Sequence, residues 1–385
     1  MCRNWVIKFW TFFILGFFVF ILPKNTYAKD YYVNPAGNDT NTGTQSSPFK
    51  TLSKGNSVLV AGDTLYVSGN YTTTLNITKS GNTSAPIKYI GQNLPKINVG
   101  SNASLSINIA ADYVVVDGFD AFGGNSHGLY TTRKHIQILN NKIHGGAASN
   151  NGSGTTCTGS AQWGSGLKLA VGAEDILIKG NEVYENCGEG LAVTRGVNVR
   201  VENNVIRDNY SVNLYLDNSP FTTAIGNQSI CTGTYLRDGN RPTAILLGNE
   251  FYDGWGSQSH DILVENNKTS GCNKAIRLYN PINGPMTNII VRNNCYIGTV
   301  DSPFASAAGA TLSNNVACGS TGGSPIPVPK VADMEPDGDV DGNDYLTLIA
   351  SFGLTGSSGW IRSDIIRNGK VDIFDFNKLI TNFGL

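Results

Sequence analysis

One short phrase recurs along the middle of this 385-residue chain and limits its fold more than any other feature. Each copy has a hydrophobic alternation, then Asn-Asn or Gly-Asn, then a small apolar patch, as in IQILNNKIHG and VRVENNVIRDN. Most copies are 21 to 27 residues apart, and two steps are 40 residues long. Repeats of this length built from short strands are typical of a solenoid. The second Asn of each copy is Asn141, Asn181, Asn204, Asn227, Asn267, Asn294 or Asn315.

The repeat predicts an all-β fold, a right-handed parallel β-helix. Alternating side chains along each strand point inward and outward, so the apolar ones stack into a continuous core. The repeated Asn can adopt the left-handed turn at low cost, and its amide can bond to the equivalent Asn one coil away. We therefore assign these asparagines a structural role rather than a catalytic one.

Composition agrees with many short strands joined by turns. Only 15% of the residues are charged and 45 are Gly, which suits strands and turns better than helices. The formal net charge is -1, so no electrostatic feature favours nucleic acid or an anionic membrane surface as a partner.

The first 28 residues have the pattern of a secretory signal. A short basic stretch precedes the apolar run FWTFFILGFFVFIL, and Thr26 and Ala28 are the small residues of a cleavage site. The alternative is an uncleaved N-terminal anchor. Cleavage predicts an extracellular protein, secreted or attached to the cell surface, with no membrane segment left. We expect a monomer.

Six cysteines remain after the signal: Cys157, Cys187, Cys231, Cys272, Cys295 and Cys318. An even number in an exported chain fits three disulfides, although fifteen pairings are possible and buried free thiols are the alternative. Cys157 and Cys231 lie in the two long steps, so pairs 157–187 and 231–272 would fix these insertions. Cys295 and Cys318 lie on adjacent coils and could also pair.

The start of the mature chain predicts a cap on the solenoid. The segment YYVNPAGNDTNTGTQSSPFKTLSKG resembles the opening of many secreted β-helix proteins that act on carbohydrates, with a strand, a loop and a short helix. Such a helix would cover the open end of the coil, where unpaired backbone groups invite aggregation. We assign residues 29–318 to the β-helix domain.

A second phrase marks one strand of each coil, as in GLKLA, GLAVT and NLYLD. Its aligned apolar residues are expected to face inward: Leu129, Leu167, Leu191, Leu214, Ile245 and Ile276. The neighbouring positions then form rows on one outer face, and these rows hold Lys168, Glu189, Tyr215 and Asp217. Acids, bases and aromatic residues on adjacent coils suit a groove for sugars.

The stretch around Lys168, GSGLKLAVGAEDILIKGNEVYENCGEG, resembles the segment of family nine polysaccharide lyases that carries their catalytic lysine. The resemblance implies β-elimination from a uronate-containing polysaccharide, in which a base removes a proton and a cation stabilises the enolate. Those lyases continue with a run of calcium-binding aspartates, where this chain has only Glu189. Arg195, Tyr215 and Asp217 are the candidates for the remaining catalytic roles. An outward Lys168 should contribute little to stability, and a solvated lysine without a catalytic role is the alternative.

Two further hypotheses use the same face. Glu189 and Asp217, on neighbouring coils, are candidates for the paired carboxylates of a glycoside hydrolase, expected roughly 5–10 Å apart. Glu250 is a third carboxylate, near the second insertion. A module that binds glycans without chemistry, by stacking on Tyr130, Tyr215 and Tyr279, is the third hypothesis.

The C-terminus contains a duplication after a Gly- and Pro-rich linker at 319–330. VDGNDYLTLIASFG is repeated as VDIFDFNKLITNFG, and each copy follows an acidic stretch and predicts a helix that ends at Gly. The oxygen donors fall at the spacing of twelve-residue calcium loops. They are Asp333, Glu335, Asp337, Asp339, Asp341 and Asp344 in the first loop, and Asp364, Asn368, Lys370 (through its backbone), Asp372 and Asp375 in the second.

Residues 331–385 resemble a type I dockerin, a small all-α calcium-binding domain. The resemblance implies Ca²⁺ as cofactor and a cohesin-domain protein as partner, chosen in that family partly by loop positions 10 and 11. These are Gly342-Asn343 and Ile373-Phe374, so the two halves differ. Ile366 offers no side-chain ligand, so the second loop should bind calcium more weakly. The alternative is a charged helical hairpin without metal.

Overall fold

The computed structural model describes most of the chain between residues 28 and 383. The described residues are 28–150, 157, 163–233, 235–236, 239–252, 259–281, 284–297, 304–305, 310–318, 340, 342–353, 365 and 370–383. The expected signal peptide and the linker at 319–330 therefore lie outside them, except for Ala28. In the described part, no helix is long and apolar enough to cross a membrane.

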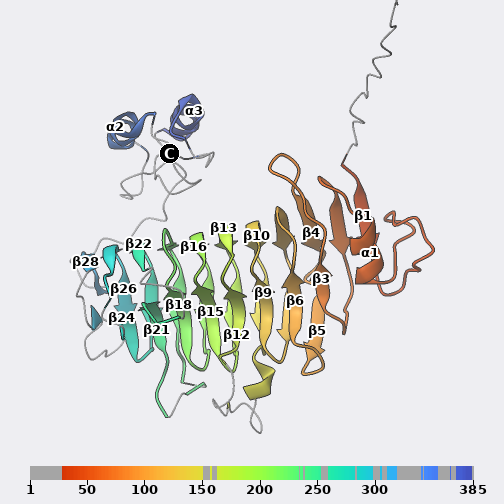
Figure 1. The fold of residues 1–385 in the computed structure, drawn as a ribbon, viewed down its shortest axis with the longest axis horizontal. Helices are drawn as coiled ribbons and strands as arrows, with labels where there is room; N and C mark the ends of the chain where they lie inside the picture. Colours follow the sequence, from red (N-terminus) through yellow and green to blue (C-terminus); the bar gives the residue numbers. More distant parts are fainter. Residues whose placement is uncertain are drawn as a thin grey trace, which may run out of the picture.

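Three parallel sheets run along the long axis of the molecule, and most coils of the chain contribute one strand to each (Figure 1). The first sheet has eleven strands. They are β1 (Asp30–Val33), β2 (Thr64–Val67), β4 (Ile87–Gly91), β7 (Val114–Asp117), β10 (Lys134–Leu139), β13 (Glu174–Lys179), β16 (Val197–Glu202), β19 (Thr223–Ile225), β22 (His260–Glu265), β25 (Thr287–Arg292) and β28 (Ala310–Ser313).

The second and third sheets have nine strands each. The second contains β5 (Lys96–Gly100), β8 (Asp120–Gly123), β11 (Lys142–His144), β14 (Glu182–Tyr184), β17 (Val205–Arg207), β20 (Gln228–Ile230), β23 (Lys268–Ser270), β26 (Cys295–Ile297) and β29 (Val316–Ala317). The third contains β3 (Leu75–Ile77), β6 (Leu105–Ile109), β9 (His127–Thr131), β12 (Ser165–Leu169), β15 (Glu189–Thr194), β18 (Val212–Asp217), β21 (Thr243–Gly248), β24 (Lys274–Tyr279) and β27 (Phe304–Ala305). This arrangement confirms the parallel β-helix.

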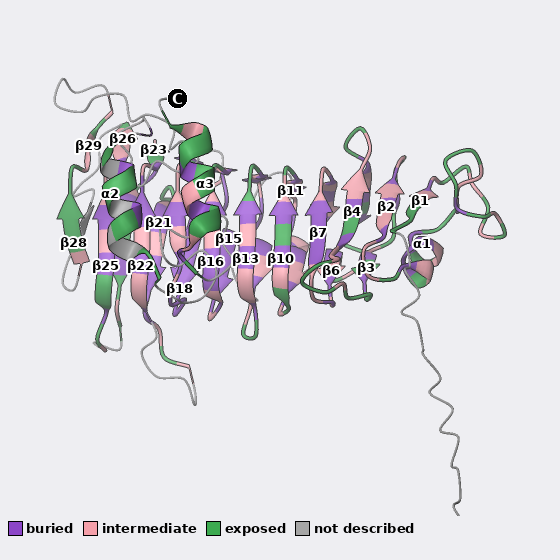
Figure 2. Ribbon diagram, turned by 90° about the horizontal axis from the view of Figure 1, so that it is seen from above, coloured by how far each residue is buried: buried purple, intermediate pink, exposed green. Residues whose placement is uncertain are grey.

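The interior is one continuous apolar column made of the inward residues of all three sheets. Ile138, Ile178 and Val201 of the first sheet, for example, stack in register and are fully buried. Figure 2 shows the buried positions repeating along the row of strands. Parallel pairing without a regular helix between strands works here because each coil bends at a turn and returns directly above itself.

The asparagine ladder predicted from the repeat is confirmed. The Nδ2 of Asn141 donates to Oδ1 of Asn181 at 3.0 Å, and the same bond repeats at 2.9–3.0 Å through all seven positions to Asn315. The left-handed turn falls on the preceding residue instead, for example Asn203 at φ 53° and Gly180 at φ 69°. Two adjacent residues thus divide the roles that we assigned to one.

A shorter second ladder was not predicted. The Nδ2 of Asn186 donates to Asn209 at 2.8 Å, and the Nδ2 of Asn209 donates to Asn213 at 3.0 Å. All three side chains are fully buried, so each amide satisfies groups at the turn before the third sheet.

All three expected disulfides form: Cys157–Cys187, Cys231–Cys272 and Cys295–Cys318. They join segments on adjacent coils, with Cα–Cα distances of 4.8–5.3 Å. The alternative of buried free thiols does not apply. The first two tie the long insertions to the solenoid, as expected from their positions.

A short helix, α1 (Leu52–Val58), packs against the strands of the first coil and covers that end of the column (Figure 1). Thr51 caps it by accepting a hydrogen bond from the Lys54 amide at 3.1 Å. Gly55 allows the close approach, because a Cβ there would lie 2.4 Å from Val33. The expected strand and helix of this cap are both present. A 3₁₀ turn, η1 (Ala148–Asn150), precedes the first insertion.

Two further helices follow near the C-terminus, α2 (Gly342–Ser351) and α3 (Ile373–Asn382). They share a small apolar core of Val340, Leu348, Val371 and Leu379. Asp372 caps α3 in a reciprocal capping box with Asp375. After α2 the chain turns at Gly353, whose φ is 87°, which agrees with the predicted stop.

Candidate functional site

The strand register predicted for the third sheet is correct. Leu129, Leu167, Leu191, Leu214 and Ile245 are aligned from β9 to β21, and all are fully buried. The residue after each of them then lies in a row on the outer face. Its members are Tyr130, Lys168, Ala192, Tyr215, Leu246 and Arg277.

A break in the in–out alternation of the strands places one more residue of β12 and of β15 on this outer face. A Cβ on Gly166 or Gly190 would lie 2.4 Å from the buried amides of Asn186 and Asn209, so both glycines face inward. The following Leu faces inward as well. Two successive inward residues interrupt the alternation, and Ser165 and Glu189 therefore face outward together with Lys168.

Lys168 and Glu189 form an ion pair on this face. The Lys168 Nζ donates to Glu189 Oε2 at 3.0 Å, and Ser165 Oγ donates to the same oxygen at 2.8 Å. The Lys168 side chain is only 13% exposed and that of Glu189 only 6%. Lys168 is thus not a solvated surface lysine, and the expectation that its loss would leave stability unchanged does not fit its burial.

His127 completes this end of the cluster. Its Nδ1 accepts a hydrogen bond from the Ser165 amide at 3.0 Å, and its ring stacks on Tyr130 at 5.3 Å. Burial, and secondarily the charge of Lys168, lower the pKa of His127 to about 4. The ring is therefore neutral at physiological pH.

Asp217, at the end of β18, is fully buried although it belongs to an outer row. The phenol of Tyr252 donates a hydrogen bond to Asp217 Oδ2. No hydrogen-bond donor reaches the buried Oδ1 within the described residues. Burial raises the pKa of Asp217 to about 6, and the charge of Glu250 adds to this effect.

Glu250 is the carboxylate near Asp217. It accepts a hydrogen bond from the phenol of Tyr215, and its backbone is fixed by two bonds to the Asn218 side chain at 2.7 and 3.0 Å. A Cβ on Gly248 would lie 2.7 Å from the Tyr215 hydroxyl and 2.9 Å from Asp217 Oδ1. These two oxygens are therefore neighbours across a glycine, with Glu250 bonded to one of them.

Arg195 borders this second group. It follows β15 in the left-handed conformation, at φ 58°, and its amide donates to the Asp217 carbonyl at 2.8 Å. Its guanidinium lies over the Tyr252 ring, 4.5 Å from the centroid. Burial and the hydrogen bond to Asp217 raise the pKa of Tyr252, and burial and the nearby carboxylates raise that of Tyr215.

The five residues predicted as catalytic thus lie on one face, but in two groups. Glu189 is level with Val212, five residues before Asp217, which corresponds to about 16 Å along the strand. The two groups are not electrostatically independent, because the charges of Lys168 and Glu189 still shift the pKa of Asp217. The carboxylate adjacent to Asp217 is Glu250 rather than Glu189.

Tyr252 was missed because nothing in the strand repeat marks it. It lies beyond the end of β21, in a segment that folds back over the face of β18. The phrase GNEFYDGW, with an acid and a phenol between glycines after a strand, was the available signal.

Most of the expected calcium ligands lie outside the described residues: Asp333, Glu335, Asp337, Asp339, Asp341, Asp364 and Asn368. Asp344 and Asp375, the twelfth positions of the two loops, are both fully buried. The amide of Asp372 donates to Asp375 Oδ2 at 2.9 Å. Lys370 precedes Asp372 by two residues. Over the described ranges, no group of three or more His, Cys, Asp or Glu residues could hold a metal ion.

Comparisons with known proteins agree with this architecture. The family described as right-handed β-helix region matches residues 110–251. A search of curated protein sequences finds no match to the chain. Among solved structures, an alginate lyase from Paenibacillus sp. str. FPU-7 aligns with 76% of this chain and 96% of its own, at 13% identity and a TM-score of 0.54.

Two other similar structures have different reported activities. Pectate lyase Pel9A aligns with 74% of this chain and 79% of its own, at 14% identity and a TM-score of 0.48. The GH136 lacto-N-biosidase from Eubacterium ramulus aligns with 75% and 68%, at 13% identity and a TM-score of 0.45. The protein is similar in fold to polysaccharide-active β-helix proteins.

Proposed function

We propose that the protein hydrolyses glycosidic bonds of a polysaccharide, with Asp217 as general acid and Glu250 as the second carboxylate. The observation that supports this most is the buried Asp217, whose pKa is raised to about 6 beside Glu250. Glycosidases need one carboxyl group that is protonated at working pH and a second that is ionised. Tyr252 and Tyr215 each hold one of the two groups through a hydrogen bond.

The charges around the cluster favour a neutral sugar. With Asp217 protonated as the general acid, the carboxylates of Glu189 and Glu250 are balanced by the cations Lys168 and Arg195. No cation is left over to neutralise a uronate brought to this face. The exposed Trp163, just before β12, and the exposed Phe251, beside Glu250, are rings of the kind that stack on sugars.

Conversion of each carboxylate to its amide tests the proposal. Asp217→Asn and Glu250→Gln should each lower kcat/KM by about 10²–10⁴-fold, the usual contribution of a general acid or base. The assay measures reducing ends released from neutral and uronate-containing glycans. Release at the wild-type rate by either variant would contradict the assignment.

The second candidate is β-elimination with Lys168, and the position of Lys168 supports it. Lys168 is nearly buried on the same face as Asp217, and its charge acts on that carboxylate. The alginate lyase of similar fold adds a precedent for elimination chemistry on such a scaffold. Elimination leaves an unsaturated product that absorbs in the ultraviolet, whereas hydrolysis does not. Absorbing products that disappear with Lys168→Ala would establish the lyase in place of the hydrolase.

We also propose that residues 331–385 are a dockerin-like module that binds Ca²⁺ and attaches a secreted enzyme to a cohesin. Exposed apolar side chains support a protein partner, among them Leu346 on α2, Phe352 just after it, and Ile373 and Phe374 on α3. Ile373 and Phe374 are the positions that select the partner in that family. Asp344 and Asp375 occupy equivalent buried places at the starts of the two helices, where a calcium ion would gather the loop carboxylates.

A further inference from the structure

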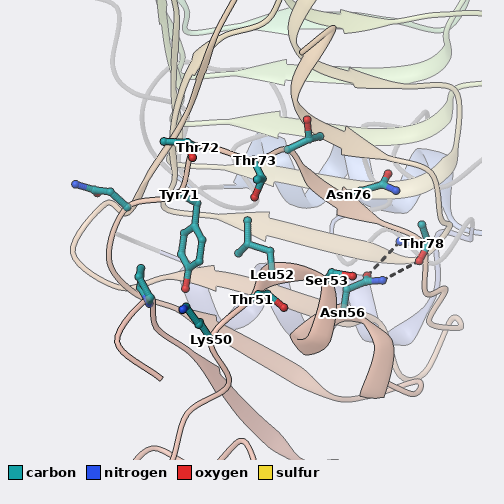
Figure 3. Close-up of a pocket in the computed structure, with 13 residues that line it drawn as sticks. Lys50, Thr51, Leu52, Ser53, Asn56, Tyr71, Thr72, Thr73, Asn76 and Thr78 are labelled. Carbon is teal, nitrogen blue, oxygen red and sulfur yellow. Dashed lines mark hydrogen bonds between the residues drawn. The ribbon is translucent and has the colours of Figure 1, made fainter. Parts of the chain in front are cut away.

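The third sheet has a polar groove beside its first strand, β3, away from the cluster around Asp217. A groove of about 590 Å³ lies between α1 and the segment that leads into β3 (Figure 3). Its volume is in the range of small-ligand sites. Five threonines, one serine and three asparagines line it, with one tyrosine, one lysine and no carboxylate.

Tyr71 provides an unused hydrogen-bonding group at this groove. Its side chain is 8% exposed, and its buried hydroxyl has no hydrogen-bond partner among the described residues. A buried polar group without a partner costs free energy, so such groups in native proteins call for an explanation. A ligand hydroxyl would supply the missing partner.

Other polar groups of the groove are already committed and fix its walls. Asn56 bonds to Thr78 and to the Tyr89 hydroxyl, at 2.8 and 2.6 Å, and Asn76 accepts from Asn108 at 2.8 Å. Within the described part of the chain, the hydroxyls of Ser53, Thr72 and Thr73, which also line the groove, make no such bonds and remain available. A rigid wall with several unused hydroxyls suits a ligand rich in hydroxyl groups.

The charges around the groove favour a neutral ligand. Lys50 is the lining cation, and the Asp39 carboxylate lies beside it, where it accepts from the Lys50 and Thr51 amides at 2.9 Å. Burial raises the pKa of Tyr71, and the charge of Asp39 adds to this effect. An anion placed at Tyr71 would meet that same carboxylate.

The groove continues the outer face that carries the catalytic candidates. Asn76 pairs in register with Asn108, Asn108 with Tyr130, and Tyr130 with Lys168. With about 4.8 Å between strands, Asn76 lies about 14 Å from Lys168 along the axis. A single extended glycan could therefore contact both regions.

We infer that this groove is a second carbohydrate subsite, which binds one or two neutral sugar units of the same polysaccharide. Its identification with a sugar rests in part on the proposed function. Its role would be to hold the chain, at a distance from the bond that is cleaved.

The test uses the full chain carrying Asp217→Asn, so that bound glycans are not consumed. The probes are cellotetraose, xylotetraose and mannotetraose, with tetragalacturonate as the anionic comparison, and affinity is measured by calorimetry. Tyr71→Phe removes only a hydroxyl without a partner among the described residues, so it should not lower the melting temperature. It should weaken binding of at least one neutral probe about fivefold or more. Thr73→Trp, which fills the groove from an exposed position, should abolish the contribution of the groove to binding of that probe.

Tyr32→Phe is the matched control, because it removes a tyrosine hydroxyl from the first sheet, where Tyr32 stacks on Tyr66. It should bind like the parent. The inference is overturned if no neutral probe binds, or if Tyr71→Phe and Thr73→Trp bind as tightly as the parent. If only tetragalacturonate binds, and its binding is lost in Lys50→Ala, the claim that the groove takes a neutral sugar would be wrong. Full cleavage by Asp217→Asn, with binding still lost in the groove variants, would reject the proposed function and leave this inference standing.

Discussion

At the scale of single residues, burial controls the chemistry of the outer face. Asp217 belongs to a row expected to face solvent, yet it is fully buried, with the Tyr252 phenol bonded to it and the charge of Glu250 nearby. An acid in such a place favours its protonated form because the carboxylate is poorly solvated. The pKa of about 6 follows from this burial, and not from the residue type.

The raised pKa of Asp217 predicts a specific pH dependence. If Asp217 is the general acid, kcat/KM should fall as pH rises through about 6, because the required proton is lost. The folded state binds this proton more tightly than the unfolded state does. The contribution to stability is therefore full below about pH 4 and is lost as pH rises through 6.

A pH profile of kcat/KM, together with urea unfolding at several pH values, checks both effects. Asp217→Asn serves as the control, and its stability should lack the loss between pH 4 and 6. Activity that rises through pH 6 would show that the ionised carboxylate is required instead.

The ion pair of Lys168 and Glu189 makes a prediction about stability. Lys168→Met should lower the free energy of unfolding by about 3 kcal/mol, because it leaves a nearly buried carboxylate without its cation. Adding Glu189→Gln should restore most of the loss. The two single variants and the double variant, compared by urea unfolding, form a double-mutant cycle. A change below about 0.5 kcal/mol in Lys168→Met would show that the pair is effectively solvated.

At the scale of structural elements, the turns between the first and second sheets hold the coils in register. Each turn combines a left-handed residue, such as Asn203, with a ladder residue, such as Asn204. The Nδ2 of Asn204 donates to Asn227 at 2.9 Å and to the Ile178 carbonyl at 3.0 Å, and its Oδ1 accepts from Asn181. Each coil is thereby linked to both of its neighbours.

These two adjacent asparagines should respond differently to substitution. Asn204→Ala should cost about 2–4 kcal/mol, because it leaves buried groups of two neighbouring coils without partners. Asn203→Gly should be close to neutral, since Gly accepts φ 53° readily. Equilibrium unfolding in urea measures both. Equal losses at the two positions would show that the turn conformation, rather than the ladder, sets stability.

At the scale of the whole molecule, the chain combines a long solenoid with a small helical pair. The solenoid has a continuous core of its own, and α2 and α3 share a separate cluster, to which the described residues contribute Val340, Leu348, Val371 and Leu379. A segment as short as 331–385 buries little apolar surface on folding, and structural ions commonly compensate for this. Calcium is the ion that the acidic loops would bind.

Calorimetric titration of the full chain with Ca²⁺ should detect two sites of unequal affinity. Asp344→Ala should remove the tighter site and Asp375→Ala the weaker one, because Ile366 deprives the second loop of a ligand. Asp30→Ala, in the first strand of the solenoid, is the control and should leave both sites intact. Titrations that show no binding would reject the dockerin-like hypothesis.

Sequence alone determined the features that depend on neighbouring residues and on the repeat. The spacing of Asn141 to Asn315 predicted the ladder, the alignment of Leu167 and Leu191 predicted the register, and cysteine positions predicted the pairs. These predictions succeed because equivalent positions of successive coils have similar residues and similar contacts, so one repeated phrase predicts many contacts.

Only the tertiary structure decided which outer residues are covered and which charges meet. The inward Gly166 and Gly190 bring Glu189 to Lys168, and the segment after β21 bonds Tyr252 to Asp217 and brings the charge of Glu250 near it. Neither event follows the repeat, because each depends on a local break in alternation or on a chain segment that folds back from another coil. Burial, and with it the raised pKa of Asp217, depends on atoms distant in sequence, which a strand pattern does not contain.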